Sequence, residues 1–405
     1  MSRVGAILML FALGCVACRS TTGPATAPTT TPTTAPTALE KRFQAELDRT
    51  RAELSFPGAT AAYVLADGTV GVAASGLADV ESRTPMTPRT RMLAASIGKS
   101  FVAATALALA QDGALDLDAP IERWLSDRPW LARLPNHDSI TLRQLLTHSS
   151  GLPDHVHTPR FARAVAKRWN EPGNPFPPEA LVEYVLDEPA RFPAGGGWSY
   201  SDTGYILVGL IIEQVARRSY YEELQQRLLE PLGLTATKPS DRRALPGLAG
   251  GYTAKDSPLG LPVKTTSAPG VMKWNPAVEW TGGGLVSTSR DLAVWGRALY
   301  EGRAFSGPYL DELLKSVPVG GASSGVRYGA GVAIHQHTPL GLSYGHGGSI
   351  PGYVSSLRYY RDHRIAVAFQ INTDVGLDDA VDQIERRLAD VVVARKRKVE
   401  RTDGT

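Results

Sequence analysis

The chain has 405 residues, 43% of them hydrophobic and 20% charged, which is the composition of an ordinary globular protein. Its net charge of +3 is small for this length and no basic stripe runs through its body, so a nucleic-acid partner is excluded. Both cysteines, Cys15 and Cys18, lie near the N-terminus, which excludes disulfides, thiolate zinc sites and cysteine nucleophiles from the remainder of the chain.

The first 18 residues have the pattern of a signal peptide. Arg3 precedes an apolar run, Val4–Cys18, that is too short to span a bilayer comfortably. Small residues stand before Cys15 and before Cys18, as they do at the cleavage boxes of bacterial lipoproteins. We therefore expect export to a bacterial periplasm or cell surface, with a lipid on one of these cysteines as a membrane anchor. Cleavage of a simple signal peptide is the alternative.

Residues 19–38 consist mostly of Thr, Pro and Ala. Such a segment has too few large apolar side chains to bury a core, and it is predicted to form an extended linker. Residues 39–395 are then the globular domain, and residues 396–405 are predicted to be a basic, solvated tail.

Apolar runs on either side of turn residues predict a hairpin near each end of this domain. Residues 58–65 and 69–75 flank Asp67-Gly68, and residues 353–360 and 364–371 flank a short polar turn. Helical patterns are predicted at residues 101–111, 121–125, 142–147, 179–186, 203–216, 220–229 and 377–395. Thr141 and Asp202 are the predicted N-caps of two of these helices.

Strands at both ends with helices between them predict an α+β fold, in which the two ends of the domain form one antiparallel sheet flanked by helices. An all-helical lobe, roughly residues 116–279, would be inserted between the two groups of strands. Long connections rich in glycine and proline fill residues 170–200 and 236–280, and the chain has no internal repeat.

Ser96 and Lys99 are the first candidates for chemistry, because residues three apart on a helix share a face. A serine hydroxyl becomes a nucleophile when an adjacent base takes its proton, and a desolvated lysine can do so. The alternative is a capping serine followed by a surface lysine. A phosphate-binding loop around Gly98-Lys99-Ser100 is rejected, because that motif needs a glycine where the chain has Leu93.

Tyr200 and Asp202 form the second candidate motif, after a glycine-rich segment. A tyrosine carries protons when nearby cations lower its pKa, and Asp202 could hold Lys99 by a charge-assisted hydrogen bond. The alternative is a loop tyrosine beside a helix-capping aspartate. Tyr309-Leu310-Asp311 has the same spacing, so the motif alone is not specific.

His346, Gly347, Gly348 and Ser349 form the third candidate motif. Two glycines after a histidine let the backbone approach a ligand closely and offer an N–H group to a carbonyl oxygen. The alternative is a glycine-rich turn that happens to contain a histidine.

In their order and spacing the three motifs resemble Ser-x-x-Lys, Tyr-x-Asn and Lys/His-x-Gly of the class C serine β-lactamases and their relatives. These relatives are D-alanyl-D-alanine carboxypeptidases, D-aminopeptidases and β-lactamase-fold esterases, which belong with the penicillin-binding proteins. Residues 140–152 and 283–292 look similar to the family as well, so the resemblance covers roughly residues 40–395.

The resemblance implies a β-lactamase/transpeptidase-like fold with the site between the sheet and the helical lobe, and no metal or organic cofactor. Ser96 would attack a carbonyl, and Lys99 and Tyr200 would pass its proton to the leaving group. The backbone N–H groups of Ser96 and Ser349 would form the oxyanion hole.

Departures from the family pattern shape the expected specificity. Asp202 stands where the family usually has asparagine, as in carboxypeptidase- and peptidase-like members, and His346 replaces the lysine of class C β-lactamases. Residues 331–335 lack the arginine that grips the substrate carboxylate in some carboxypeptidases. Strong β-lactam hydrolysis is therefore not expected.

The expected function is that of a serine hydrolase resembling D-alanyl-D-alanine carboxypeptidases or D-amino-acid peptidases, with a small molecule or cell-wall peptide as substrate. An esterase or a weak class C-like β-lactamase is the alternative, and an inactive module that binds cell-wall peptides is the alternative without catalysis. The pairs His155/His157 and His335/His337 resemble metal ligands only superficially, so no metal is expected, and His148 is expected to be structural.

Overall fold

The computed structural model describes residues 35–168, 176–256, 260–305, 307–321, 324–377 and 380–402. The predicted signal peptide, Cys15, Cys18 and most of the predicted linker lie outside these ranges. Within them, no helix combines the length and the apolar character needed to cross a bilayer.

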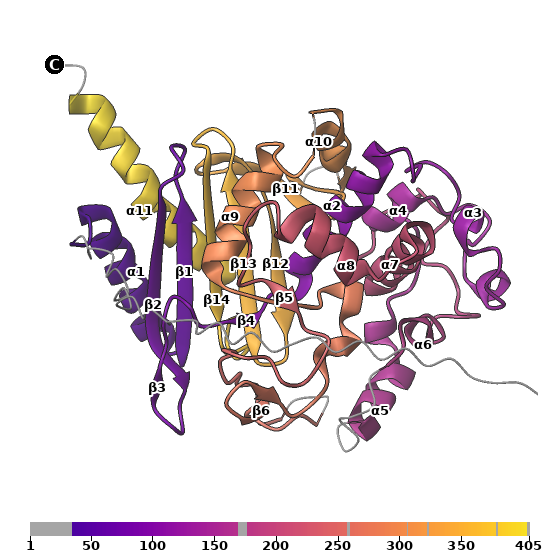
Figure 1. Ribbon diagram of the computed structural model, residues 1–405, viewed down its shortest axis with the longest axis horizontal. Coiled ribbons are helices and arrows are strands. Elements are labelled where there is room, and N and C mark those ends of the chain that lie inside the picture. The colour runs from indigo at the N-terminus through magenta and orange to yellow at the C-terminus, as the bar shows by residue number, and fades with distance from the viewer. Residues whose placement is uncertain are drawn as a thin grey trace, which may run out of the picture. The chain divides into compact units, whose positions relative to one another are not determined.

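The central element is an antiparallel sheet whose middle is built from both ends of the domain (Figure 1). β1 (Gly58–Val64) pairs with β2 (Val70–Asp79) on one side and with β14 (Ile365–Ile371) on the other. Both predicted hairpins, β1–β2 and β13–β14, are confirmed. The strand order is β3-β2-β1-β14-β13-β12-β11-β10-β9. The remaining strands of this sheet are β3 (Thr84–Pro85), β9 (Val317–Pro318), β10 (Val326–Gly329), β11 (Val332–Thr338), β12 (Gly341–Ile350) and β13 (Tyr353–Tyr360).

Both faces of the sheet are covered, which explains why its central strands are continuous apolar runs. Side chains alternate between the two faces of a strand, and in β1 Ala61 and Tyr63 face a core formed with α1 (Ala38–Leu54) and α11 (Val381–Thr402). Ala62 faces the opposite core, which includes α9 (Ser289–Tyr300) and the helices of the middle segment. Figure 1 shows α1 and α11 on one side and α9 across the other face.

The segment between β4 and β5 is mainly helical, and α7 is its buried core helix. Its elements are α2 (Gly98–Gln111), α3 (Glu122–Leu125), α4 (Leu142–Leu146), α5 (Pro159–Arg168), α6 (Pro178–Val182), α7 (Asp202–Ala216) and α8 (Tyr220–Leu224), with short turns η1 (Ala95–Ile97), η2 (Leu131–Arg133), η3 (His155–His157) and the π-helical η4 (Gln225–Leu229). After it follow η5 (Pro276–Val278), η6 (Trp280–Gly282) and α10 (Gly307–Leu314).

Several predicted helix ends are wrong. The helix predicted at 179–186 ends at Val182, and i→i+3 hydrogen bonds such as Val185 N–H to Val182 continue it only as turns. α11 begins four residues later than predicted and runs to Thr402, because the residues predicted as a tail are mostly good helix formers. Ser201, not Asp202, caps α7, since its Oγ accepts the Gly204 N–H. Thr141 is confirmed as the N-cap of α4.

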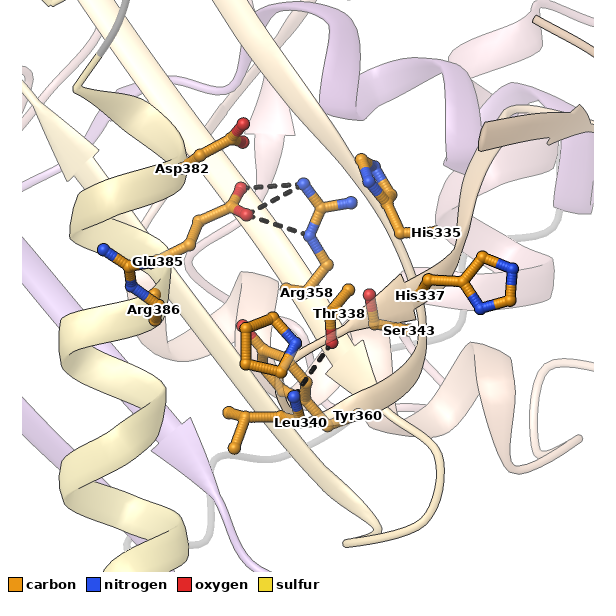
Figure 2. Close-up of a pocket in the computed structure, with 11 residues that line it drawn as sticks. His335, His337, Thr338, Leu340, Ser343, Arg358, Tyr360, Asp382, Glu385 and Arg386 are labelled. Atoms are coloured by element: carbon orange, nitrogen blue, oxygen red, sulfur yellow. Dashed lines mark hydrogen bonds and ion pairs between the residues drawn. The ribbon is translucent and has the colours of Figure 1, made fainter. Parts of the chain in front are cut away.

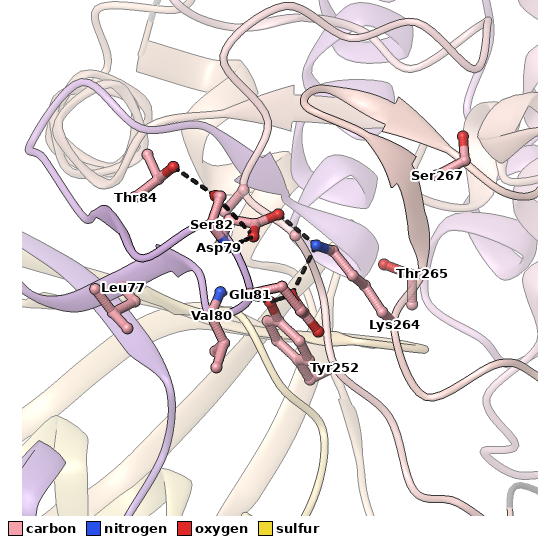
Figure 3. A network of polar contacts seen from close by, with 12 residues as sticks. Leu77, Asp79, Val80, Glu81, Ser82, Thr84, Tyr252, Lys264, Thr265 and Ser267 are labelled. Atoms are coloured by element: carbon pink, nitrogen blue, oxygen red, sulfur yellow. Dashed lines mark hydrogen bonds and ion pairs between the residues drawn. The ribbon is translucent and has the colours of Figure 1, made fainter.

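The long connection before α9 is anchored to the end of β2 by a polar network (Figure 3). Lys264 donates to Asp79 at 2.5 Å and to Glu81 at 2.7 Å, and the Tyr252 hydroxyl donates to Glu81 at 2.8 Å. These bonds fix a segment that contains few regular elements. Two of its strands, β5 (Lys238–Pro239) and β8 (Leu285–Ser287), form a small sheet with β4 (Met92–Leu93), and β6 (Thr266–Ala268) pairs with β7 (Val271–Met272) in another.

Candidate active site

Ser96 lies in the short turn η1, which leads directly into the first turn of α2. The preceding residue, Ala95, has a φ of +47°, a strained backbone conformation that L-residues rarely adopt. Glycines pack against this turn from two sides: a Cβ atom on Gly283 would lie 2.6 Å from the Ala95 carbonyl, and one on Gly348 would lie 2.5 Å from the carbonyl oxygen of Ala94. The strained turn is therefore held by close backbone contacts that need glycine.

Lys99 is completely buried beneath Ser96, and its Nζ donates to Ser96 Oγ at 3.1 Å. The same ammonium group donates to the Gly282 carbonyl and forms an ion pair with Asp202. Burial lowers the pKa of Lys99, but Asp202 and Tyr200 together raise it by more, so the pKa lies above its ordinary value. The raised pKa and the ion pair with Asp202 indicate that Lys99 is a cation in the resting site.

The Tyr200 hydroxyl is buried beside this ion pair and has no hydrogen-bond partner of ordinary geometry in the described part of the chain. The Nζ of Lys99 lies 4.9 Å from the centre of the Tyr200 ring. Burial raises the pKa of Tyr200 to about 12, although Lys99 and Ser96 lie close enough to counter part of the rise. Tyr200 is thus a neutral phenol with a proton to donate.

His346 is held as a neutral imidazole on β12. Its Nδ1 donates to the Gly347 carbonyl, which can only accept, so Nε2 accepts a hydrogen bond from the Tyr328 hydroxyl at 2.7 Å. Burial and the charge of Lys99 lower the pKa of His346 to about 4. Tyr328 belongs to no motif, and sequence reasoning missed it.

His148 lies in the wall of the site, with its ring centre 4.1 Å from that of Tyr200. Its Nδ1 accepts the Ser201 N–H at 3.2 Å, which requires a neutral ring, and burial holds its pKa well below the ordinary value. The expected structural role fits this contact, and the contact also orients Tyr200. His148 lies in the segment 140–152 that resembles the family.

The third motif forms an open edge of the sheet. β12 pairs with β13 as far as Ile350, but its register with β11 ends at Gly345. On the β11 side, therefore, residues 346–350 have no strand partner among the described residues. Gly347 and Ser349 of this edge line the pocket that contains Ser96.

The predicted site residues come together around one pocket of about 490 Å³. Its lining contains Ser96, Tyr200, Asp202, His346, Gly347, Gly348 and Ser349, and Lys99 lies beneath it. The lining also includes residues that sequence reasoning did not assign to the site, namely Asp154, Val156, His157, Val354, Ser355, Leu377 and Val381. Cys15 and Cys18 lie outside the described residues.

A second cavity, of about 230 Å³, lies between α11 and strands β11–β13 (Figure 2). Its main feature is a buried ion pair in which Arg358 donates to Glu385 at 2.9 Å, tying α11 to the sheet. His335 and His337 also line it, but no predicted catalytic residue is in its described lining. Across the described ranges, no group of three or more His, Cys, Asp or Glu side chains could hold a metal ion.

Comparison with known proteins gives concordant matches. Residues 39–391 match the profile of the family described as Beta-lactamase. Penicillin-binding protein 4* of Bacillus subtilis is 26% identical over 74% of this chain and 64% of its own length. D-aminopeptidase of Gluconobacter oxydans is 28% identical over 82% of this chain and 58% of its own length. The chain thus spans less than two thirds of these two relatives. A solved D-stereospecific amidohydrolase from Streptomyces sp. has a TM-score of 0.74 and 28% identity, covering 87% of this chain and 97% of that one.

Proposed function

Because the chain belongs to the beta-lactamase family, we propose that it is a serine hydrolase that forms an acyl-enzyme at Ser96 and acts on D-amino-acid peptides or amides. The observation that carries this proposal is that Lys99, at the base of the pocket, donates a hydrogen bond to Ser96 and forms an ion pair with Asp202. The named activities of the Gluconobacter and Streptomyces relatives support the substrate class.

The geometry supports a proton path that begins from a charged Lys99. As Ser96 Oγ attacks the carbonyl, Lys99 takes the hydroxyl proton and gives one of its own to Asp202. The negative charge of Asp202 then reappears on the oxyanion, so the charge balances. Tyr200 next donates its proton to the leaving nitrogen, and Asp202 returns a proton to Tyr200 through Lys99.

Backbone N–H groups are the proposed oxyanion donors. Ser96 N–H lies in η1, directly before the N-terminus of α2, where the helix dipole favours negative charge. The N–H of Ser349 comes from the open edge of β12, beside Gly347 and Gly348. His346, a neutral group, is proposed to hold this edge in place through its bond to the Gly347 carbonyl.

Ester hydrolysis is the second candidate activity. An ester needs the nucleophile and the oxyanion donors but no cationic group for a substrate carboxylate. Among the described residues that line the pocket there is no lysine or arginine. Carboxypeptidase substrates and β-lactams carry a carboxylate that a cation would bind. The absence of lysine and arginine from the described lining therefore argues against strict carboxypeptidase activity and strong β-lactam hydrolysis. An inactive peptide-binding module is disfavoured because Ser96, Lys99 and Tyr200 keep their reactive groups.

The proposal is tested by covalent labelling with a fluorophosphonate and by a substrate panel. The panel contains a D-amino-acid amide, a D-Ala-D-Ala peptide, nitrocefin and a p-nitrophenyl ester. Wild type should be labelled, and Ser96→Ala should lose labelling and turnover while it keeps its fold. Ser267→Ala, which changes an exposed serine of β6, is the matched control. Activity of Ser96→Ala within about tenfold of wild type would contradict the assignment.

We further propose that the protein is exported and anchored to a membrane through a lipid on Cys15 or Cys18. The support is the apolar segment that ends at these cysteines and the Thr/Pro-rich segment after them. A diacylated cysteine would contribute two buried chains to membrane binding. Mass spectrometry of the mature N-terminus, in wild type and in the single variants Cys15→Ser and Cys18→Ser, identifies the modified residue. An unmodified start beyond residue 18 on released protein contradicts the anchor.

A further inference from the structure

We propose that Asp154 binds the protonated α-amino group of the substrate, so that the enzyme acts on aminoacyl amides and peptides with a free ammonium group next to the attacked carbonyl. This inference rests on the proposed function and narrows its substrate class. It assigns a specificity-determining residue to a position outside the three motifs.

Asp154 is held rigidly at the edge of the pocket. Its Oδ1 accepts the Val156 N–H at 3.2 Å and so caps the short turn η3. Two hydrogen bonds fasten this turn to the start of α7: the His155 N–H donates to Thr203 Oγ1 at 3.0 Å, and Ser201 Oγ donates to the Pro153 carbonyl at 3.0 Å. The start of α7 also carries Asp202, so Asp154 has a fixed place beside the catalytic ion pair.

The carboxylate of Asp154 lines the same pocket as Ser96 and is only 6% exposed, yet no lysine or arginine of the described chain forms an ion pair with it. His155 and His157 are its nearest basic neighbours, at 3.8 and 3.9 Å, which exceeds hydrogen-bond distance. Burial lowers the pKa of His155 to about 4, so its ring is neutral, and the side chain of His157 is 78% exposed. Lys99 is already paired with Asp202.

The site therefore has more carboxyl groups than cations. Burial and the charge of Asp202 raise the pKa of Asp154 to about 6 and that of Glu279 to about 7. A ligand ammonium would relieve this excess of negative charge, whereas a ligand carboxylate would increase it. A buried carboxylate without a cationic partner is costly in the free enzyme, and a substrate ammonium group would supply the missing partner.

The structure of the substrate brings its ammonium group into the same pocket as the attacked carbonyl. In an aminoacyl amide the α-nitrogen is attached to the carbon next to the attacked carbonyl, so it enters the pocket with that carbonyl. Asp154 and Ser96 both line this pocket, and the open β12 edge with Ser349 is part of its wall. The carboxylate can thus fix the orientation of the acyl group while Ser96 attacks.

The test compares D-alanine p-nitroanilide with N-acetyl-D-alanine p-nitroanilide, which differ in the ammonium charge. Wild type should favour the free amine in kcat/KM by about 10- to 100-fold, the value of a charge-assisted hydrogen bond. Asp154→Asn should reduce this ratio by a similar factor, mainly through KM, because asparagine keeps the cap of η3 but not the charge. Asp67→Asn is the matched control, since Asp67 also accepts the N–H two residues on, that of Thr69, in a distant hairpin.

A binding measurement provides a readout independent of turnover. Calorimetric titration of Ser96→Ala with D-alaninamide near pH 6, in two buffers of different ionisation enthalpy, should show proton release. Ser96→Ala/Asp154→Asn should release fewer protons, and N-acetyl-D-alaninamide should release none. A wild-type preference for the N-acetyl substrate, or a ratio that Asp154→Asn leaves unchanged, overturns the inference.

The two proposals fail in different ways. If Ser96→Ala keeps fluorophosphonate labelling and p-nitrophenyl acetate hydrolysis, the proposed function is wrong. If Ser96 is labelled and at least one of the two p-nitroanilides is cleaved, but the free amine has no advantage, only the assignment of Asp154 is wrong. If the ester is hydrolysed but neither p-nitroanilide is cleaved, the D-amino-acid substrate class of the proposed function is wrong, and the assignment of Asp154 falls with it. The wild-type substrate ratio decides this even if Asp154→Asn does not fold.

Discussion

Asp202 forms an ion pair with Lys99, a lysine that has no exposed surface. Asp202→Asn leaves this cation buried without its counter-charge, which typically destabilises a protein by about 3–5 kcal/mol. In wild type the pKa of Lys99 is raised, so the stabilisation is complete below the ordinary lysine pKa of about 10.4 and lost only at higher pH. In Asp202→Asn the counter-charge is gone, and burial lowers the pKa of Lys99. The destabilisation of the variant relative to wild type therefore grows as the pH falls.

Urea unfolding at about pH 6 and about pH 9 measures this dependence, and the destabilisation by Asp202→Asn should be larger at the lower pH. Asp118→Asn is the control, because it breaks an ion pair with Arg143 in which the Asp118 side chain is 69% exposed. That change should cost less than about 1 kcal/mol. An equal loss for Asp202→Asn at both pH values would show that Lys99 is not held as a cation by Asp202.

His346 should remain neutral throughout the physiological pH range, because burial and Lys99 lower its pKa to about 4. A histidine with an ordinary pKa would instead change the activity near pH 6.5. The structure moves this titration to lower pH. We expect kcat/KM for a neutral ester to show the same inflections between about pH 6 and pH 8 in wild type and His346→Gln, even if the variant is slower. An inflection near pH 6.5 that disappears in His346→Gln would contradict this.

The same lowered pKa predicts how stability depends on pH. As the pH falls, the unfolded state binds a proton at His346 before the folded state does. The contribution of the neutral ring is therefore complete above about pH 6.5 and is lost progressively towards pH 4. Between about pH 7 and pH 4.5, His346→Gln should lose less stability than wild type, by on the order of 2 kcal/mol. Urea unfolding of wild type and His346→Gln at each pH measures this difference. The other histidines are the same in both proteins, so their contributions cancel.

His346→Lys should move selectivity towards substrates that carry a carboxylate. The variant would add a cation to a pocket whose described lining has carboxylates but no lysine or arginine. The ratio of kcat/KM for nitrocefin to that for a p-nitrophenyl ester should rise, although loss of the bond to Tyr328 should lower both values. If wild type already hydrolyses nitrocefin faster than the ester, at roughly 10⁶ M⁻¹s⁻¹ or above, the role given to His346 and Asp202 is wrong.

The sequence predicted the hairpins and the three motifs because their signals are local. Continuous apolar runs mark strands with two buried faces, and Ser96 and Lys99 are one helical turn apart. α1 was not predicted, although Leu39, Phe43 and Leu47 form an apolar stripe at helical spacing directly after the Thr/Pro/Ala-rich segment.

The remainder of the site depends on contacts between distant segments. Tyr328 reaches His346, and Asp154 reaches the start of α7, only when the chain folds, and neither belongs to a motif. β12 contains three glycines among the four residues 345–348, a composition that strand propensity disfavours. The strand forms because β13 pairs with it, and Gly348 has to be glycine because the turn before Ser96 comes too close for a side chain.

The two neighbouring glycines of the third motif should therefore respond differently to the same added methyl group. A Cβ on Gly348 would lie 2.5 Å from the Ala94 carbonyl oxygen, to which Ser355 Oγ also donates at 2.8 Å. The added Cβ would lie even closer to Ser355 Oγ, and the Ala94 carbonyl cannot move without shifting the strained turn that carries Ser96. For Gly347 the nearest atom to an added Cβ is the Ser355 carbonyl oxygen at 3.9 Å, an ordinary contact.

Gly348→Ala should cost about 1–3 kcal/mol of stability, as overpacking of a tight contact does, and should reduce kcat/KM for a p-nitrophenyl ester by at least about 100-fold. Gly347→Ala makes the same change one residue earlier on β12, but it should have a much smaller effect on both stability and kcat/KM. Ester kinetics and urea unfolding of the two variants, measured side by side, provide the comparison. Equal losses in the two variants would mean that the β12 edge needs flexibility in general, whereas a loss confined to Gly348→Ala ties activity to the distance between this strand and the turn at Ser96.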